Sequence, residues 1–193
     1  MYYATGMSTV PAGLPPLTIR IARLDGDDPD AYARHMVEHM AESGVRGSPH
    51  FALSRTWSRD EVRASFVGRL AKALDEPLWG RTWLLLDERR VVGHVELRGG
   101  RLLAEMHRAT LGMGILRAYT GQGHGPRLLE TAVRWARSEA GLAFIDLGVF
   151  SGNAPARKLY ERMGFTVIGL REDAFRLEAG PVIDDVQMAL RLR

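Results

Sequence analysis

Apolar side chains recur along the chain with two different periods, which predict an alternation of strands and helices. Leu17, Ile19 and Ile21 alternate with polar residues, as in a first strand with one face turned inward. A helix is expected to begin at the aspartates 27 and 28, before Pro29. Its apolar positions are four residues apart: Tyr32, Met36 and Met40. We expect those methionines to lie in the core.

A second helix has its own start signal. Ser58 and Glu61 are spaced as a capping box, in which each side chain bonds the other residue's backbone N–H. An apolar stripe follows it at Val62, Phe66, Leu70 and Leu74. The later expected elements are strands 82–86 and 91–97 around a polar turn, a strand from about 105 to 115, a strand 144–149, a helix 153–163 with Gly164 as its C-cap, and closing strands 166–177 and 182–192 around the turn 178–181.

The stretch 111–137 carries the most informative local pattern. Residues 111–116 are apolar, as in a strand, and a helix with one buried face follows from near Gly125, at Leu128, Leu129, Ala132, Val133 and Ala136. Between them, glycine alternates with polar residues: Gly121, Gln122, Gly123, His124 and Gly125. Such a turn exposes backbone N–H groups at a helix N-terminus, where an anion is favoured, and Pro126 suits the first helical turn. A simple tight change of direction is the alternative.

Two nucleotide-binding loops are excluded by the residues around these glycines. A Walker loop would end in Gly-Lys-Ser/Thr, whereas the last glycine here is followed by Pro126 and Arg127. A dinucleotide loop needs Gly-x-Gly-x-x-Gly, whereas the spacing here is even. The anion site, if present, therefore belongs to another class of protein.

A second motif narrows that class. Residues 153–165 read NAPARKLYERMGF, directly after the apolar run 144–150. Together with YTGQGHGPRLLE this stretch resembles the two cofactor motifs of the GNAT superfamily of N-acetyltransferases. The second motif matches at Asn153, Ala156, Leu159, Tyr160, Gly164 and Phe165. The first departs only at Thr120, where arginine or glutamine is usual. The resemblance implies a mixed α/β (α+β) fold, with a mostly antiparallel central sheet of about seven strands, flanking helices and splayed central strands.

The resemblance also implies a cofactor, acetyl-coenzyme A (acetyl-CoA). Its pyrophosphate would lie on the loop amides, and its pantetheine between the strands that end at Ile115 and Phe150. A backbone N–H near Gly114 would polarise the thioester carbonyl. The implied cofactor-binding residues are Met113, Gly114, Ile115, Thr120, Gly121, Gln122, Gly123, His124, Gly125, Pro126, Asn153 and Ala156. Asn153 can instead, or in addition, cap the helix that it precedes.

By the same resemblance, Tyr160 is the acid that protonates the departing sulfur; its alternative role is a packed aromatic. The base is less defined, because Ala109 and Thr110 stand where many family members carry a glutamate on the strand. His107 is the first candidate and Glu96 the second. His94 and Glu105 are further candidates, and water can carry the proton instead.

Composition agrees with one compact domain over 17–193, preceded by a flexible leader at 1–16. The 193 residues are 46% hydrophobic and include no cysteine, so disulfides and thiolate chemistry are excluded. No apolar run is long enough to span a bilayer, which favours a soluble, cytoplasmic protein. A net charge of +3 and a pI of about 9.6 suit a phosphate-bearing cofactor, and no nucleic-acid-binding motif is present.

No metal site is expected. His35 and His39 have metal-ligand spacing on one helical face, but no third ligand is evident, and a solvated or hydrogen-bonded pair is the simpler interpretation. The sequence therefore predicts direct transfer of acetyl from acetyl-CoA to a primary amine of a small molecule or a protein N-terminus. The segment 44–57 is the candidate substrate loop, and a homodimer is common in resembling proteins. Two alternatives stay open: a non-catalytic acyl-CoA sensor or interaction module, and transfer of a larger acyl group.

Overall fold

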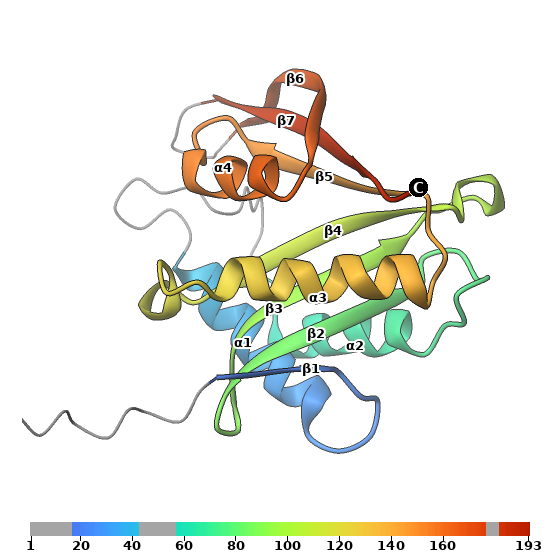
Figure 1. The fold of residues 1–193 in the computed structure, drawn as a ribbon. Coiled ribbons are helices and arrows are strands. Elements are labelled where there is room, and N and C mark those ends of the chain that lie inside the picture. The colour runs from blue at the N-terminus through green and yellow to red at the C-terminus, as the bar shows by residue number, and fades with distance from the viewer. Residues whose placement is uncertain (1–16, 43–56, 177–181) are drawn as a thin grey trace, which may run out of the picture.

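The computed structural model describes residues 17–42, 57–176 and 182–193, which build one mixed sheet and four α-helices (Figure 1). The predicted leader, most of the predicted substrate loop and the 178–181 turn lie outside these residues. The strands are β1 (Thr18–Ile21), β2 (Gly80–Asp87), β3 (Arg90–Gly99), β4 (Arg108–Ile115), β5 (Phe144–Phe150), β6 (Thr166–Arg176) and β7 (Val182–Arg191). The helices are α1 (Asp28–Ala41), α2 (Arg59–Leu70), α3 (His124–Ser138) and α4 (Ala154–Arg162).

The sheet has the order β1-β2-β3-β4-β5-β7-β6, and only β4 and β5 run parallel. Their pairing covers three residues of each strand and ends at Thr110 and Asp146. Beyond that pair the two strands separate, which Figure 1 shows as a gap that widens toward the N-terminus of α3. The expected seven-stranded, mostly antiparallel sheet with splayed central strands is therefore confirmed.

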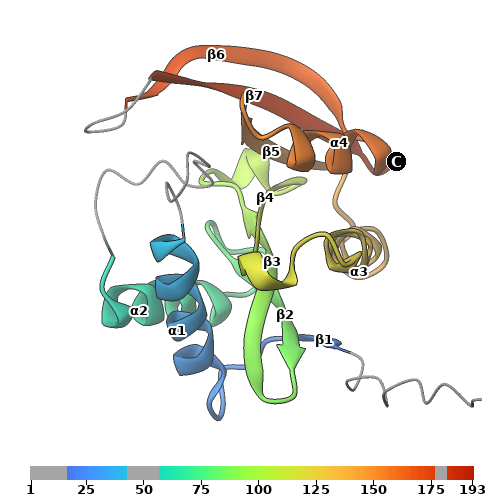
Figure 2. The same ribbon diagram turned by 90° about the vertical axis from the view of Figure 1, so that its left-hand side faces the viewer.

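Helices cover both faces of the sheet (Figure 2). α3 and α4 lie on one side, and α1 and α2 lie on the other. The α3 side holds the larger core, and the helical stripe predicted there is buried as expected: Leu128, Leu129, Ala132, Val133 and Ala136. The α1 side holds a smaller core around Tyr32, Phe66 and Leu84, and Met36 and Met40 pack against it half-buried.

Several local predictions can be checked at the ends of elements. The capping box of α2 is confirmed, because Glu61 N–H donates to the Ser58 hydroxyl and Ser58 N–H donates to the Glu61 carboxylate. β1 is less buried than its pattern indicates, since Ile21 is 39% exposed. β4 begins at Arg108 rather than near Glu105, because Leu103–Glu105 forms a 3₁₀ turn in which the Glu105 carboxylate accepts two backbone N–H groups.

The two faces of β4 differ in their side chains. Its odd-numbered residues pack into or against the α3 core: Ala109, Leu111, Met113 and Ile115. The α1 side of the same strand carries glycine at 112 and 114. A methyl group on Gly114 would lie 2.5 Å from His39 Nε2 and 2.9 Å from His94 Cε1, whereas one on Gly112 would lie 3.7 Å from Arg98 Nη2. Glycine at 114 is thus required by the close approach of two histidines.

Three histidines are buried where α1 crosses β3. His35 and His39 come from α1 and His94 from β3, and none is more than 5% exposed. A hydrogen bond of 2.9 Å joins His35 Nε2 and His94 Nδ1. Burial lowers the pKa of His35 to about 3 and holds the pKa of His94 well below its usual value. Both rings are therefore neutral in the folded protein at physiological pH.

We expect Gly114→Ala to lower the free energy of unfolding by ~1–3 kcal/mol, because the added methyl overlaps buried rings that cannot move freely. Gly112→Ala on the same face of the same strand is the control, and its methyl finds ordinary contact distances. Denaturant melts of both variants provide the measurement. Equal loss in the two variants would contradict the packing described here.

We also expect stability to fall with acidification in a defined window. Below pH 6.5 the unfolded chain protonates His35 and His94 while the folded chain leaves them neutral, so unfolding is favoured as pH falls. Each of the two histidines contributes up to ~1.4 kcal/mol per pH unit to this loss of stability between about pH 6.5 and 5. This window lies above the pH range in which carboxylates titrate. Urea melts at several pH values should show a smaller slope in His35→Asn than in the unmodified protein, and an equal slope in the two would contradict this expectation.

Candidate active site

The glycine loop between β4 and α3 leaves its backbone uncovered. Gly121 and Gly123 have φ of +74° and +81°, the left-handed region that other residues rarely adopt. A methyl group on either would have no neighbour within 4 Å. Gly123 is the N-cap of the 15-residue α3 and has no side chain to satisfy the first N–H groups of the helix. Uncovered first-turn amides and the positive end of a helix dipole both favour an anion at such a position.

The side chains beside the glycines hold the loop in shape. The Thr120 hydroxyl donates to the Arg117 carbonyl at 2.8 Å, and the Gln122 amide donates to the Ala118 carbonyl at 2.9 Å. The Tyr119 hydroxyl donates to Asp87 on the β2–β3 turn at 2.6 Å. Thr120, the residue that departs from the family motif, thus bonds its own turn. Further on, partial burial and the Arg127 charge lower the pKa of His124.

Gly125 allows the glycine loop to lie close to α4. A methyl group there would lie 3.1 Å from Leu159 Cδ2 of α4, so the Leu159 side chain would have to shift by a few tenths of an ångström to accommodate it. At the start of α4, the Asn153 side chain accepts a hydrogen bond from Ala156 N–H at 3.3 Å and caps this helix. Asn153 and Ala156 therefore begin α4 directly after β5.

The gap between β4 and β5 leaves backbone groups available on one edge of β4. Leu116 N–H donates to the Val92 carbonyl, so the alternation of an antiparallel ladder directs Gly114 N–H toward β3. The same alternation directs the N–H groups of Met113 and Ile115 toward β5, which no longer pairs with them. A ligand in the gap can bond these groups as an added strand would.

Tyr160 lies on α4 within the large core and is 7% exposed. Its ring packs against Phe165, with 5.7 Å between ring centroids. Burial raises the pKa of the Tyr160 hydroxyl to about 12. The phenol is therefore protonated at neutral pH and can act as a hydrogen-bond donor.

The candidate bases fall into two groups. His107 is exposed before the start of β4, beside Phe144, and Glu105 is exposed in the preceding turn. β4 runs from this end toward the glycine loop, so the structure does not bring either residue to the loop. Glu96 and His94 are buried on β3, opposite Gly112 and Gly114. The Glu96 carboxylate accepts from Arg69 Nε at 2.8 Å and lies 3.7 Å from Arg98 Nε.

Two further charged residues face the gap on the α1 side, and sequence reasoning missed both. Arg98 of β3 places Nη2 3.7 Å from a methyl position on Gly112, and Asp185 of β7 places Oδ1 2.7 Å from one on Gly148 of β5. Asp185 is 5% exposed, and burial raises the pKa of its carboxyl. Strand alternation through His94, Glu96 and Arg98 is the signal that could have indicated the first.

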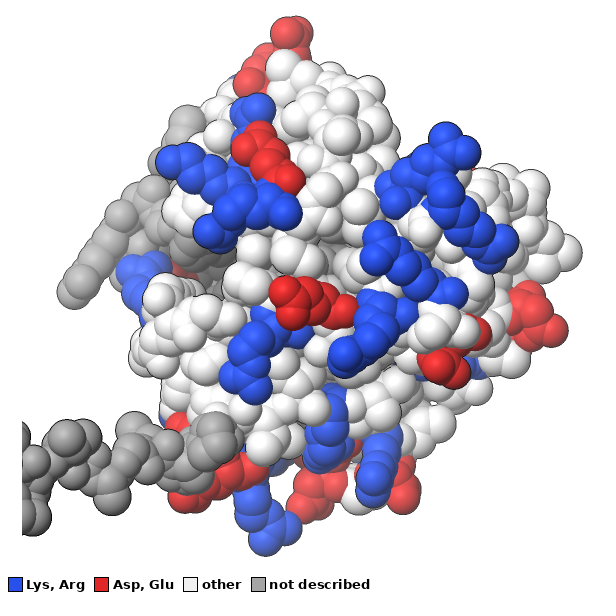
Figure 3. All heavy atoms as spheres, viewed as in Figure 1, with Lys and Arg blue, Asp and Glu red and all other residues white. Residues whose placement is uncertain are grey.

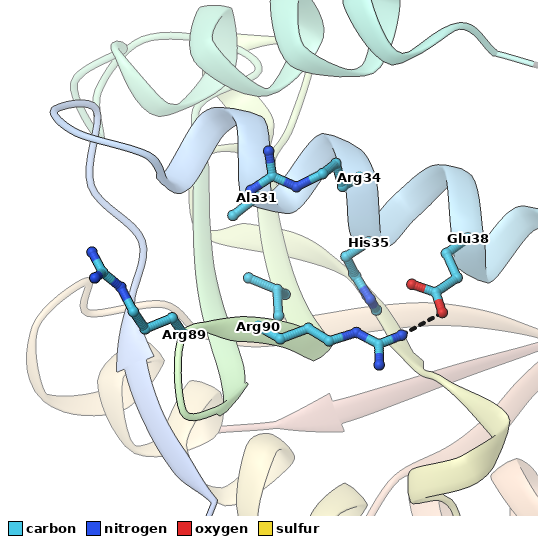
Figure 4. Close-up of a pocket in the computed structure, with 7 residues that line it drawn as sticks. Ala31, Arg34, His35, Glu38, Arg89 and Arg90 are labelled. Carbon is cyan, nitrogen blue, oxygen red and sulfur yellow. Dashed lines mark hydrogen bonds and ion pairs between the residues drawn. The ribbon is translucent and has the colours of Figure 1, made fainter.

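The described part of the molecule also contains two cavities of similar volume. A cavity of about 410 Å³ lies between α1 and the β2–β3 turn (Figure 4), where Arg90 donates to Glu38 across its mouth. A second, of about 420 Å³, lies beside Arg98, Thr110 and Asp146. In the described part of the chain, no group of three ligating side chains is arranged to hold a metal ion.

Basic side chains dominate the face that carries α3 and α4, as the blue atoms in Figure 3 show. Exposed on these two helices are Arg127, Arg134, Arg137, Arg157, Lys158 and Arg162. A positive surface beside the glycine loop favours a phosphate-bearing ligand.

Among the described residues, none of the helices has the length and apolar character of a membrane-spanning segment.

Known proteins share this arrangement. The N-acetyltransferase YycN of Bacillus subtilis (strain 168), itself uncharacterized, is 26% identical over 156 residues, which cover 77% of this chain and 93% of the relative. The yncA protein of Salmonella typhimurium, solved with its cofactor acetyl-CoA, superimposes with a TM-score of 0.76 at 21% identity, over 92% of this chain and 94% of that one. Spermidine N-acetyltransferase from Vibrio cholerae, solved with CoA and spermine, gives 0.69 at 20% identity, over 91% and 95%.

The family of this chain follows from more than half of its sequence. Residues 32–165, from α1 to the end of the second sequence motif, match the description "Acetyltransferase (GNAT) family". This span includes the splayed strands, the glycine loop and α4. The chain therefore belongs to the GNAT family of acetyltransferases, enzymes that move an acetyl group from acetyl-CoA to an amine.

Proposed function

We propose that this chain transfers acetyl from acetyl-CoA directly to a primary amine that binds on the α1 side of the gap between β4 and β5. The separation of these strands in front of an uncovered glycine loop is the observation that carries the proposal. Acetyl-CoA is the cofactor of the yncA protein, which has the same fold. Its role here rests on how well the residues of this chain fit it.

Two parts of the cofactor, the pyrophosphate and the pantetheine arm, find matching groups in this chain. N–H groups of the loop, from Gly121 to Gly125, can bind the pyrophosphate at the positive end of α3. N–H groups of Met113 and Ile115 can bind the pantetheine arm, and the start of α4 at Asn153 and Ala156 closes the other side. Thr120, Gln122, His124 and Pro126 shape the loop.

When bound, the cofactor supplies an acetyl thioester next to β4. The N–H of Met113 or Ile115 then donates to the carbonyl oxygen, and a fixed donor of this kind stabilises the negative charge that develops as an amine attacks. The acceptor approaches from the α1 side near Gly112, where a methyl group would meet only Arg98 Nη2 at 3.7 Å. The rings of His39 and His94 cover Gly114 on that side, while Met113 and Tyr160 contribute to packing on the other side.

Tyr160 assists the departure of the sulfur. Because its pKa is raised to about 12, above the value of ~8.5 for a free thiol, a hydrogen bond to the thiolate is more favourable than complete proton transfer. The amine must also lose a proton, and burial makes His94 a poor acceptor. Water in the gap is the simplest carrier of that proton, and Glu96 is held by Arg69 in an ion pair.

Proteins with this fold have names that describe different acceptors. Relatives with this fold include spermidine N-acetyltransferase and ribosomal-protein-alanine N-acetyltransferase, whose names describe a small polyamine and a protein as acceptors. The acceptor here must therefore be inferred from the side chains around the gap.

The phosphate loop can be tested with two glycines of identical conformation. Gly121→Asp adds a negative charge where the pyrophosphate is expected, and should abolish the rise in melting temperature that CoA produces in the unmodified protein. Gly26→Asp is the control, because Gly26 also has φ of +74° and no neighbour within 4 Å. The two variants place a side chain at the same φ, so equal CoA protection in both would argue against the loop as the phosphate site.

The role of Tyr160 can be tested with Tyr160→Phe, which removes only the hydroxyl. We expect kcat for thiol release to fall by about 10–10²-fold, the usual effect of losing a hydrogen bond to a charged group, with CoA protection unchanged. Unchanged turnover would assign Tyr160 to packing alone. A protein that binds CoA and releases no thiol with any amine would favour the sensor alternative.

A further inference from the structure

We propose that the acceptor is zwitterionic, an amine that also carries a carboxylate or a similar oxyanion, and that Arg98 binds this anion while Asp185 faces the amine. The inference rests on the proposed function and names the substrate class of the same site. It rests on two side chains of opposite charge on either side of the gap: Arg98 lies over Gly112 of β4, and Asp185 lies over Gly148 of β5.

The two glycines occupy equivalent places. Thr110 and Asp146 are the last paired residues of β4 and β5, and Gly112 and Gly148 each come two residues later. Both fall on the α1 side of their strands, where the acceptor is expected. With no side chain at either position, the groups that reach over from β3 and β7 line the opening.

Arg98 has its charge available on the β3 side. Its side chain is 46% exposed, and Nη2 lies 3.7 Å from the methyl position of Gly112. Glu96, its nearest carboxylate, already accepts a 2.8 Å hydrogen bond from Arg69 and lies 3.7 Å from Arg98 Nε, beyond hydrogen-bond length. Within the described residues, no protein acceptor takes a hydrogen bond from the Arg98 guanidinium, which leaves its planar set of donors for an oxyanion.

Asp185 supplies the opposite charge on the β7 side. Its carboxylate lies over Gly148 and is contacted by Gln187 Nε2 at 2.5 Å and by Arg171 Nη1 at 3.6 Å. Arg171 is 61% exposed, so water screens this ion pair strongly. A buried carboxylate with weak compensation is stabilised by an incoming ammonium group. Its raised pKa also suits it to take a proton from that group.

The spacing suits a small zwitterion. Gly112 and Gly114 are two residues apart, roughly 7 Å along the strand, and the N–H of Met113 lies between them. An amine that attacks near Met113 therefore brings a carboxylate one or two carbons away within reach of the flexible Arg98 side chain. A cavity of about 420 Å³, also lined by Arg98 and Thr110, lies at the end of β4 away from the glycine loop, and groups of the acceptor that extend past Arg98 would lie toward it.

The charges around that cavity disfavour a polycation. It is lined by Arg98, Arg101 and Arg108, together with Glu105 and Asp146. Arg108 is bound by Asp146 at 2.8 Å, and Glu105 accepts from backbone N–H groups. Positive charge is therefore in excess, and a polyamine chain extending into the cavity would be repelled.

The experiment compares matched acceptors. Leucine, methionine, phenylalanine and glutamate are offered beside their α-carboxamides, which keep the amine and lose the negative charge, and beside 2-aminoethylphosphonate and spermidine. Thiol release from acetyl-CoA gives kcat/KM for each. We expect the preferred acid to exceed its carboxamide by at least about tenfold, the usual effect of a hydrogen bond to a charged group.

Variants assign the effect to side chains. Arg98→Gln is expected to raise KM for the acid and bring the acid and its carboxamide to within about twofold, and Arg98→Lys to restore part of the preference. Asp185→Asn is expected to lower kcat for acid and carboxamide alike. Arg89→Gln, an exposed arginine on the β2–β3 turn, is the control. CoA protection should be unchanged in all four variants.

The outcomes separate this inference from the proposed function. Equal or faster turnover of carboxamides or spermidine, or an Arg98→Gln variant that keeps the preference for the acid, would overturn the zwitterionic acceptor and leave the acetyltransferase proposal intact. Failure of CoA to protect the unmodified protein, with no thiol release from any amine, would overturn both.

Discussion

The parting of β4 and β5 after three paired residues is the constraint on which the rest of the site depends. A strand in the middle of a sheet normally satisfies its backbone groups on both edges, and leaving one edge unpaired costs free energy unless water or a ligand bonds it. Here the unpaired edge ends at a glycine loop that also exposes N–H groups. Both features are unfavourable in isolation, and both are explained by one elongated ligand that runs from the loop into the gap.

The two sides of this gap have different tasks because strand alternation separates them. The α3 side is closed by apolar packing around Met113, Leu159 and Tyr160, so it can exclude water from a thioester. On the α1 side, Gly112 leaves room below Arg98, and the Asp185 carboxylate lies directly over Gly148. In the proposed direct transfer, cofactor and acceptor would meet between these two surfaces.

Local patterns predicted the elements well, whereas contacts between distant segments were not predictable. The glycine loop, the α3 stripe and the Asn153 cap depend on neighbours within one or two turns. The pairing of His35 with His94 joins residues 59 apart, and Asp185 reaches Gly148 only through the β5–β7 register. His107 shows the same limit: it was expected within a strand from about 105, but β4 begins at Arg108, and its direction puts His107 at the end away from the loop.

Glu96 illustrates why a buried carboxylate in a family site need not be the base. Removing a carboxylate from water costs several kcal/mol, and a close guanidinium offsets that cost only while the pair stays intact. Glu96 is 5% exposed and takes its short hydrogen bond from Arg69, so accepting a proton would weaken the interaction that makes its burial tolerable. One arginine would suffice for compensation, yet Arg98 also lies near the second oxygen at 3.7 Å. At that distance Arg98 makes no hydrogen bond to Glu96, so its guanidinium stays available over Gly112 to an anionic acceptor group.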